Sequence, residues 1–279
     1  MKIIAFDIGG TDVKYGICEN GNLTNGSFPV RGNDEDATLP ERIKDFVLSN
    51  SPDKVAVCAP GPFDFKNGIS LAEHKLAELY RVNLGDVIRS AGVSDVFFVC
   101  DSGAFLLGMM SLYPDARQGR ACGVTIGTGL GYVASIDGKL WVDENEKPKN
   151  SLWCAPWENG ICEEFVSATA IRKKAAEIGF ENMSVRKLSF LAKGGNGKLL
   201  KLFDTMGEDL GKILTERSKL DKYERIFFGG NVTRSWELFQ KGFERYCTIP
   251  YTVAENPDTA ALHGLLWASE IDKDNIYTY

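Results

Sequence analysis

The chain has 279 residues, of which 44% are hydrophobic and 25% are charged, a composition typical of a globular protein with one large or two medium-sized domains. Its net charge of −6 comes from 32 basic and 38 acidic residues with no long basic run, which argues against nucleic acid as a partner. The seven cysteines are scattered and odd in number, as expected for reduced thiols. The start MKIIAFDIGG has no signal-peptide pattern, and the most apolar stretch, 96–112, is interrupted by Asp101-Ser102-Gly103. We therefore expect a cytoplasmic protein that binds no membrane.

The first part of the chain predicts mostly strands, two pairs of which are joined by Asn-Gly turns at Asn20-Gly21 and Asn67-Gly68. Thr38-Leu39-Pro40-Glu41, with proline in the first turn, is typical of a helix start, and we expect this helix to run to about Ser49. Further helices are expected at 84–91 and 104–112. The expected strands are 3–6, 15–18, 23–29, 55–58, 63–65, 69–72 and 96–100.

The second part begins with the same pattern of strands and turns. A strand at 122–126, a glycine turn at 127–131 and a strand at 132–136 precede Asp137-Gly138 and a strand at 139–142. Helices are then expected at about 164–178, 184–193, 198–220, 236–246 and 258–270, and strands at 226–228 and 249–253. This weak repeat indicates two similar α/β halves with a ligand cleft between them.

Both glycine turns have a composition that suits phosphate. Glycine lets the backbone approach a ligand closely and adopt φ > 0, and successive N–H groups form an anion site to which Thr11 and Thr128 add hydroxyls. Asp7 would repel a phosphate directly, so Mg²⁺, bound through water, is expected between them. The alternative is a pair of tight hairpins without a ligand. A P-loop is absent, and each turn leads into a strand, which excludes a dinucleotide fingerprint.

Asp101 follows an apolar strand in the segment FFVCDSGAF, directly before a helix. A carboxylate at such a junction is either the N-cap of the helix or a general base. Its position along the chain leaves both interpretations open.

With these features together, the sequence resembles the ROK family of sugar kinases within the actin-like ATPase superfamily. DIGGTDVKYG resembles the family's first phosphate motif, GTGLG its second, and IFFGGNV the glycine pair near the adenosine. APGPFDFKNGISLA and DTAALHGLLWA resemble its Pro-Gly segment and its closing helix, so the matches span the whole chain in the right order.

The resemblance implies an α/β protein of two actin-like (ribonuclease-H-like) domains with an interdomain cleft that closes on a sugar. The expected domains are 1–102, completed by the C-terminal helix 258–279, and 103–257. The implied activity is transfer of the γ-phosphoryl group of ATP, as its Mg²⁺ complex, to a hydroxyl of a hexose, amino sugar or related glycoside. The resemblance also implies a homodimer.

The resemblance also implies roles for single residues. Asp101 is the general base that takes the proton from the sugar hydroxyl. The sugar ligands are Gly61, His74, Asp101 and Glu163. ATP and Mg²⁺ are held by the glycine segments, and Asp7 binds the metal through water. The residues that bind ATP and Mg²⁺ are Asp7, Gly9, Gly10, Thr11, Lys14, Gly127, Thr128, Gly129, Gly229 and Gly230. For His74 a solvated loop histidine is the alternative, and for Glu163 an acidic residue favoured by a helix dipole.

Two segments depart from the family pattern. Where the family has Asn-Asp-Ala-Asn, this chain has Cys100-Asp101-Ser102-Gly103. The family's zinc segment corresponds to KPKNSLWCAPWENGICEEF, which contains no histidine and lacks the Glu-x-x-His pair that grips the sugar. Because Cys154 and Cys162 alone cannot form a four-ligand site, we expect no structural zinc.

Two other functions are alternatives to a kinase. A sugar-responsive transcription regulator would carry a winged helix-turn-helix before the first motif, and we expect none because that motif begins at the start of the chain. A non-catalytic sugar- or nucleotide-binding protein is favoured by the altered sugar segment. The presence of both glycine turns and of Asp101 counts against it.

Overall fold

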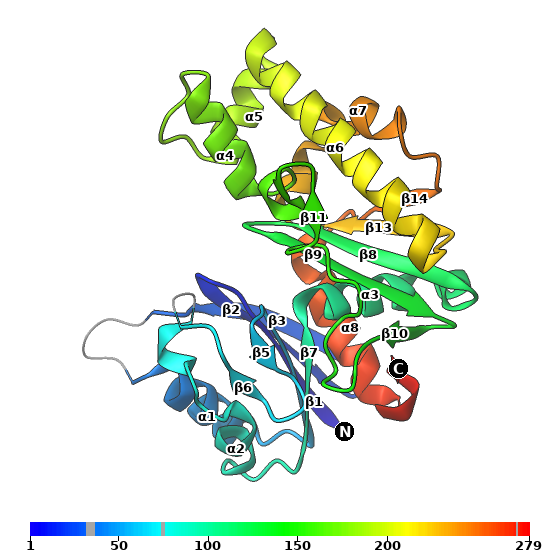
Figure 1. Cartoon of the computed structure of the whole chain (residues 1–279). Coiled ribbons are helices and arrows are strands. Elements are labelled where there is room, and N and C mark those ends of the chain that lie inside the picture. Colours follow the sequence, from blue (N-terminus) through cyan, green and yellow to red (C-terminus); the bar gives the residue numbers. More distant parts are fainter. Residues whose placement is uncertain (32–36, 74–75, 272) are drawn as a thin grey trace. The chain divides into compact units, whose positions relative to one another are not determined.

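A computed structural model describes residues 1–31, 37–73, 76–271 and 273–279, and it has the expected mixed α/β architecture (Figure 1). The chain forms two compact units. Unit 1 consists of Met1–Asp115, Gly138–Lys149 and Thr259–Tyr279, and unit 2 of Ala116–Asp137 and Asn150–Asp258. The C-terminal segment thus belongs with the N-terminal one. The predicted boundary between the two domains at 102/103 stays a prediction.

Unit 1 is built on a five-stranded sheet with the order β3-β2-β1-β4-β7. The first three strands form an antiparallel meander, and β4 and β7 run parallel to β1. Strands that are buried on both faces are continuously apolar, and Ile4, Ala5 and Phe6 of β1 are fully buried. The parallel strands end at the same edge of the sheet. The bounds are β1 (Lys2–Ile8), β2 (Asp12–Glu19), β3 (Asn22–Pro29), β4 (Lys54–Ala59) and β7 (Asp95–Cys100).

Helices cover both faces of this sheet, with α1 and α2 on one side and α3 and α8 on the other (Figure 1). Helix α1 starts with a capping box in which the Glu41 carboxylate accepts the Thr38 backbone N–H at 2.8 Å. Residues Ser102 to Met110 of helix α3 are all buried, as expected for a helix whose sequence is apolar on nearly all sides. The remaining bounds are α1 (Leu39–Asn50), α2 (Leu84–Arg89), α3 (Asp101–Leu112), α8 (Pro257–Glu270), β5 (Phe63–Asp64), β6 (Ile69–Ser70), β10 (Lys139–Trp141) and β15 (Tyr277–Thr278).

Unit 2 contains strands in the order β14-β13-β8-β9, with β9 antiparallel to β8 and the others parallel to it. The long helix α6 packs along α7, where a side chain at Gly207 or Gly242 would overlap the backbone of the other helix. The bounds are β8 (Arg120–Ile126), β9 (Leu130–Ile136), β11 (Pro156–Trp157), β12 (Gly160–Ile161), α4 (Ala168–Glu177), α5 (Val185–Lys193), α6 (Gly197–Asp221), β13 (Arg225–Gly229), α7 (Gln240–Glu244) and β14 (Tyr251–Val253).

Most of the expected elements are present, and the differences have local causes. The turn residues Asn20 and Gly21 have φ of 52° and 80°, and Asp137 and Gly138 have 49° and 80°, as a two-residue hairpin turn of type I′ requires. The helix expected at 164–178 begins only at Ala168, because Ser167 is its N-cap. Strands β11, β12 and β15 were not expected; they are two residues long, which is too short for a period-two pattern.

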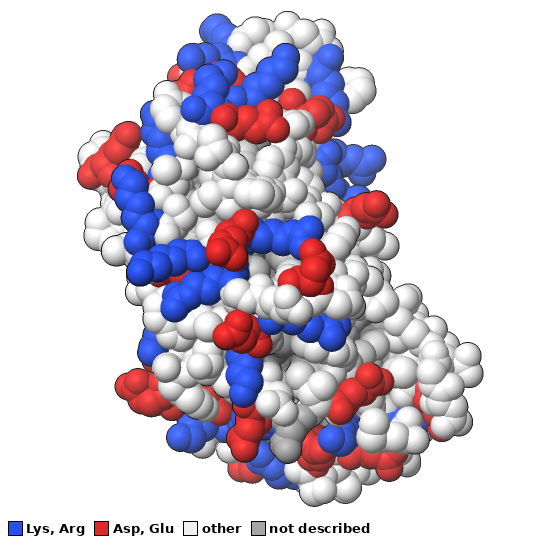
Figure 2. All heavy atoms as spheres, turned by 90° about the vertical axis from the view of Figure 1, so that its right-hand side faces the viewer, with Lys and Arg blue, Asp and Glu red and all other residues white. Residues whose placement is uncertain are grey.

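The surface carries both signs of charge. On the face shown in Figure 2, Lys and Arg are interspersed with Asp and Glu. In the part of the chain that the structure describes, no helix is both long and apolar enough to cross a membrane.

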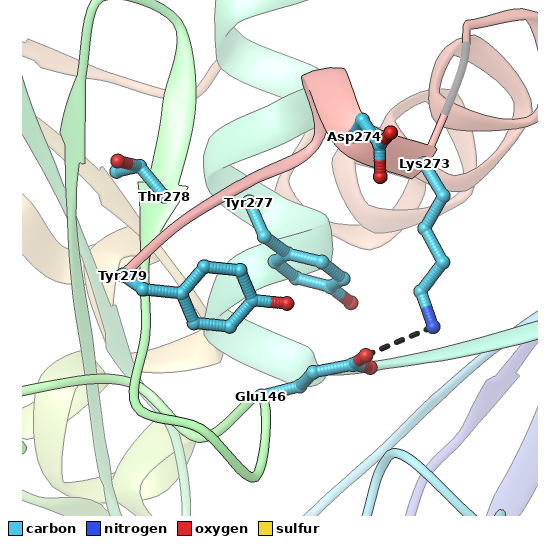
Figure 3. A pocket seen from close by; sticks show the side chains of 6 residues that line it. All are labelled: Glu146, Lys273, Asp274, Tyr277, Thr278 and Tyr279. Carbon is cyan, nitrogen blue, oxygen red and sulfur yellow. Dashed lines mark ion pairs between the residues drawn. The ribbon is translucent and has the colours of Figure 1, made fainter.

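A buried carboxylate lies beside β15 in unit 1. A cavity of about 440 Å³ is lined by Glu146 and by residues of the C-terminal segment. Figure 3 shows the side chains of these residues. Glu146 is 5% exposed; its Oε1 lies 2.9 Å from the Nζ of the half-exposed Lys273, whereas its Oε2 is buried without a hydrogen-bond partner. Since removing one member of a buried ion pair leaves an uncompensated charge, we expect Lys273→Met to lower the free energy of unfolding by about 1–3 kcal/mol.

Urea unfolding tests this expectation. In the matched control, Lys219→Met, the partner is the exposed Glu216, so the loss should stay below about 0.5 kcal/mol. Adding Glu146→Gln to Lys273→Met should recover most of the stability, because no unpaired charge then remains. Equal losses in the two lysine variants would contradict a specific role of the Glu146 pair.

Candidate functional site

Asp7 lies near the end of β1, where the parallel strands of unit 1 finish. In the sheet register it pairs with Cys58 on β4 and with Lys14 on β2. The Cys58 thiol donates a hydrogen bond to Asp7 Oδ1 over 3.3 Å. Burial, and after it the negative charge of Asp7, raises the pKa of the Cys58 thiol well above its usual value, so the thiol stays protonated and can donate.

Asp101 is the first residue of α3, at the end of β7. The N-cap is Cys100, whose Sγ accepts the Gly103 N–H at 3.2 Å, so the N-cap interpretation of Asp101 is wrong. The Asp101 side chain is exposed, and its Oδ1 accepts the Ser102 N–H at 2.7 Å. Burial, with a contribution from Asp101, raises the pKa of the Cys100 thiol to about 12. Asp7 and Asp101 thus lie at the same edge of the unit 1 sheet, with Cys58 between their strands.

The first glycine turn follows Asp7 directly. It is closed by a hydrogen bond from the Gly9 N–H to the Asp12 carbonyl at 2.9 Å. Gly10 and Thr11 are exposed, and within the described residues their N–H groups have no hydrogen-bond partner. A Cβ at Gly10 would enter open space, so a ligand can reach this backbone.

The second glycine turn, in unit 2, has the same properties and is tied to helix α4. The Gly127 N–H donates to the Gly129 carbonyl at 3.0 Å, and Thr128 and Gly129 keep N–H groups that are unpaired among the residues described. On the carbonyl side, the Ala168 N–H donates to Gly127 and the Thr169 hydroxyl to Thr128, both at 2.8 Å. A Cβ at Gly127 would again enter open space.

The turn glycines do not use the freedom of glycine to adopt φ > 0. Gly9, Gly10, Gly127 and Gly129 all lie outside the left-handed region. Glycine serves here by leaving space: a Cβ at Gly129 would overlap the Glu163 carboxylate, and one at Gly10 or Gly127 would narrow the approach to the unpaired N–H groups.

The glycine pair after β13 has a structural requirement of its own. Gly229 is buried, and Gly230 has φ of 87° with its ideal Cβ 2.5 Å from the Ile126 carbonyl oxygen. Any side chain at position 230 would be strained, whether or not a nucleoside binds beside it.

The predicted sugar ligands have different surroundings. Glu163 lies in a 3₁₀ turn, Cys162–Glu164, ahead of α4, and its Oε2 accepts the Leu130 N–H at 2.9 Å. Gly61 is exposed, with open space at its Cβ position. His74 lies outside the described residues. The roles of these residues stay predictions.

The described residues contain few groupings of possible metal ligands. Among them, no group of three or more His, Cys, Asp or Glu side chains could hold a metal ion. Mg²⁺ needs only one or two carboxylates when phosphates and water supply its other ligands. The Asp7 carboxylate beside the open backbone of Gly10 therefore fits a Mg²⁺–phosphate group.

Unit 1 thus has an α/β fold with two carboxylates, Asp7 and Asp101, at one edge of its sheet. The ROK family model matches residues 3–263, and the chain belongs to the ROK family. A beta-glucoside kinase from Listeria monocytogenes is 31% identical over 143 residues, which cover 50% of this chain and 48% of that relative; the match thus spans about half the length of the curated relative.

Solved structures support the same fold. A ROK family protein from Streptococcus pneumoniae in complex with sucrose is 20% identical, with a TM-score of 0.80 over 97% of this chain and 99% of the other. A ROK family glucokinase from Streptomyces griseus in complex with glucose and AMPPNP is 18% identical, with a TM-score of 0.74 over 98% of this chain and 100% of the other. The expected actin-like α/β fold is confirmed.

Sequence reasoning missed three contacts of the site. Cys58 was interpreted only as a core thiol. Its position near the end of an apolar strand, like that of Asp7, is a signal that could have placed the two side chains at the same edge of the sheet. Cys100 is the N-cap in place of the usual polar residue, and Thr169 holds Thr128; neither contact has a signal in the spacing of residues.

Proposed function

We propose that this protein is an ATP-dependent sugar kinase that transfers the γ-phosphoryl group of MgATP to a hydroxyl of a hexose, amino sugar or related glycoside. The observation that carries the proposal is the sheet edge of unit 1, where Asp7 and Asp101 lie beside an open glycine turn with unpaired N–H groups. Membership of the ROK family, the beta-glucoside kinase relative and the glucokinase bound to glucose and AMPPNP support it.

The proposed chemistry assigns each group a task. Asp101 takes the proton of the attacking sugar hydroxyl, whose oxygen forms the new bond to the γ-phosphorus while ADP leaves with the bridging oxygen. Asp7 would hold Mg²⁺ through water, and the ion would neutralise phosphate charge. The N–H groups of both glycine turns and Lys14 would position the phosphates, Gly229 and Gly230 would flank the nucleoside, and Gly61, His74 and Glu163 would contact the sugar.

We also propose a homodimer and the domain division at 102/103 from the family membership. A kinase that uses ATP and carries seven free thiols fits a reducing cytoplasm. Sedimentation velocity tests the dimer, since a single species near 30.7 kDa would contradict it.

The function is tested by measuring MgATP-dependent ADP release with hexoses, amino sugars, N-acetyl sugars and β-glucosides, alongside calorimetric titration of ADP. Release that depends on one class of sugar supports the kinase and names its substrate. Binding of ADP without turnover of any sugar would favour the second candidate, a non-catalytic binding protein, which the altered segment before Glu163 suggests.

A further inference from the structure

The second glycine turn is held from two sides. Helix α4 binds its carbonyl groups through Ala168 and Thr169, as described above. On the amide side, Glu163 Oε2 accepts the Leu130 N–H at 2.9 Å. The carboxylate lies directly against the backbone, because a Cβ at Gly129 would overlap it. The absence of a side chain at Gly129 is thus what allows this contact.

Glu163 is itself anchored to the start of α4. Its carbonyl accepts the Ser167 hydroxyl at 2.8 Å, and the same Ser167 oxygen, as N-cap, accepts the Ala170 N–H at 2.9 Å. The 3₁₀ turn, the N-terminus of α4 and the glycine turn therefore form one hydrogen-bonded group within unit 2. Moving the Glu163 carboxylate would free the turn at Leu130 while leaving α4 capped.

We propose that Glu163 is a positioning residue that holds the glycine turn in its phosphate-binding conformation before any sugar is present. This inference rests on the proposed function. Hydrogen bonds to a charged acceptor are stronger than neutral ones, and an ordered turn loses less conformational freedom when phosphate binds to its free N–H groups at Thr128 and Gly129. This role is separate from the proposed contact of Glu163 with the sugar, because it affects nucleotide binding when no sugar is present.

The negative charge of Glu163 works against this role, since a carboxylate close to a phosphate site repels the nucleotide. The two effects are separable by substitution. Glu163→Gln keeps an oxygen acceptor for the Leu130 N–H and removes the charge, whereas Glu163→Ala removes both. If ordering of the turn dominates, loss of the acceptor weakens binding; if repulsion dominates, both variants bind more tightly than the native protein.

The test is calorimetric titration of ADP with Mg²⁺ in the absence of sugar. We expect Glu163→Ala to raise the Kd of ADP about 5- to 20-fold, and Glu163→Gln to stay within about threefold of native. Glu164→Ala is the matched control. The Glu164 carboxylate is exposed and accepts the Ile161 N–H at 3.1 Å instead of an N–H of the glycine turn, so the Kd of this variant should be native.

The outcomes distinguish failure of the inference about Glu163 from failure of the proposed function. A native Kd in Glu163→Ala, or a tighter one, overturns the inference while leaving the kinase intact. Native protein that binds no ADP refutes the proposed function itself, and the inference with it. Should Glu163→Ala fail to fold by circular dichroism, Glu163→Asp replaces it, because the shorter side chain withdraws the carboxylate from Leu130 and should raise the Kd similarly.

Discussion

The Asp101→Asn variant should phosphorylate its sugar about 10²–10⁴ times more slowly than the native protein and should still bind MgADP with native affinity. Asparagine has the same shape as aspartate, and its oxygen can still accept the Ser102 N–H at the start of α3. The substitution therefore removes the proposed proton acceptor and changes the helix start little. Its effect should appear in kcat, because the proton moves only in the transition state.

The measurement is sugar-dependent ADP release, with ADP affinity determined calorimetrically on the same samples. Asp95→Asn is a matched control, since Asp95 lies at the other end of β7 and its partner Lys54 is on the surface. That variant should keep native kcat. A kcat in Asp101→Asn within a few-fold of native would rule out Asp101 as the general base.

The Gly264→Ala variant should lose about 2–4 kcal/mol of stability, because α8 passes α3 at van der Waals contact of the two backbones. An ideal Cβ at Gly264 would overlap the Ala104 carbonyl oxygen, and one at Gly108 would overlap that of Ala260. Both overlaps are with backbone atoms, which cannot turn away, so the helices must separate. For a chain of this size we expect Tm to fall by roughly 5–10 °C.

The control for this substitution is Gly197→Ala, in the first turn of α6, where a Cβ would meet nothing within 4 Å. Alanine has the higher helix propensity, so that variant should be as stable as the native protein or slightly more so. Differential scanning calorimetry compares the two. Since α3 begins at Asp101, Gly264→Ala should also lower kcat when kcat is measured at a temperature well below the Tm of the variant. If both stability and kcat stayed native, close packing of α3 on α8 would be contradicted.

The features that the sequence determined by itself are local ones. Asn20-Gly21 and Asp137-Gly138 specify hairpin turns because their residues tolerate the φ values that such turns need. The apolar run ending at Asp7 specifies a buried strand with a carboxylate at its end. Each feature depends on a few neighbouring residues. The order of the family motifs along the chain then predicted the fold.

Only the tertiary structure decided which residues meet across long separations. Cys58 reaches Asp7 over 51 positions and Glu163 reaches Leu130 over 33, in both cases through contacts set by strand register and helix packing. Gly129 shows the consequence for interpretation. Its sequence context indicated a phosphate-binding turn, whereas the fold shows that it also leaves room for the Glu163 carboxylate. Backbone preference is encoded locally, but the space beside a residue is filled by segments distant in the chain, and the fold alone assigns it.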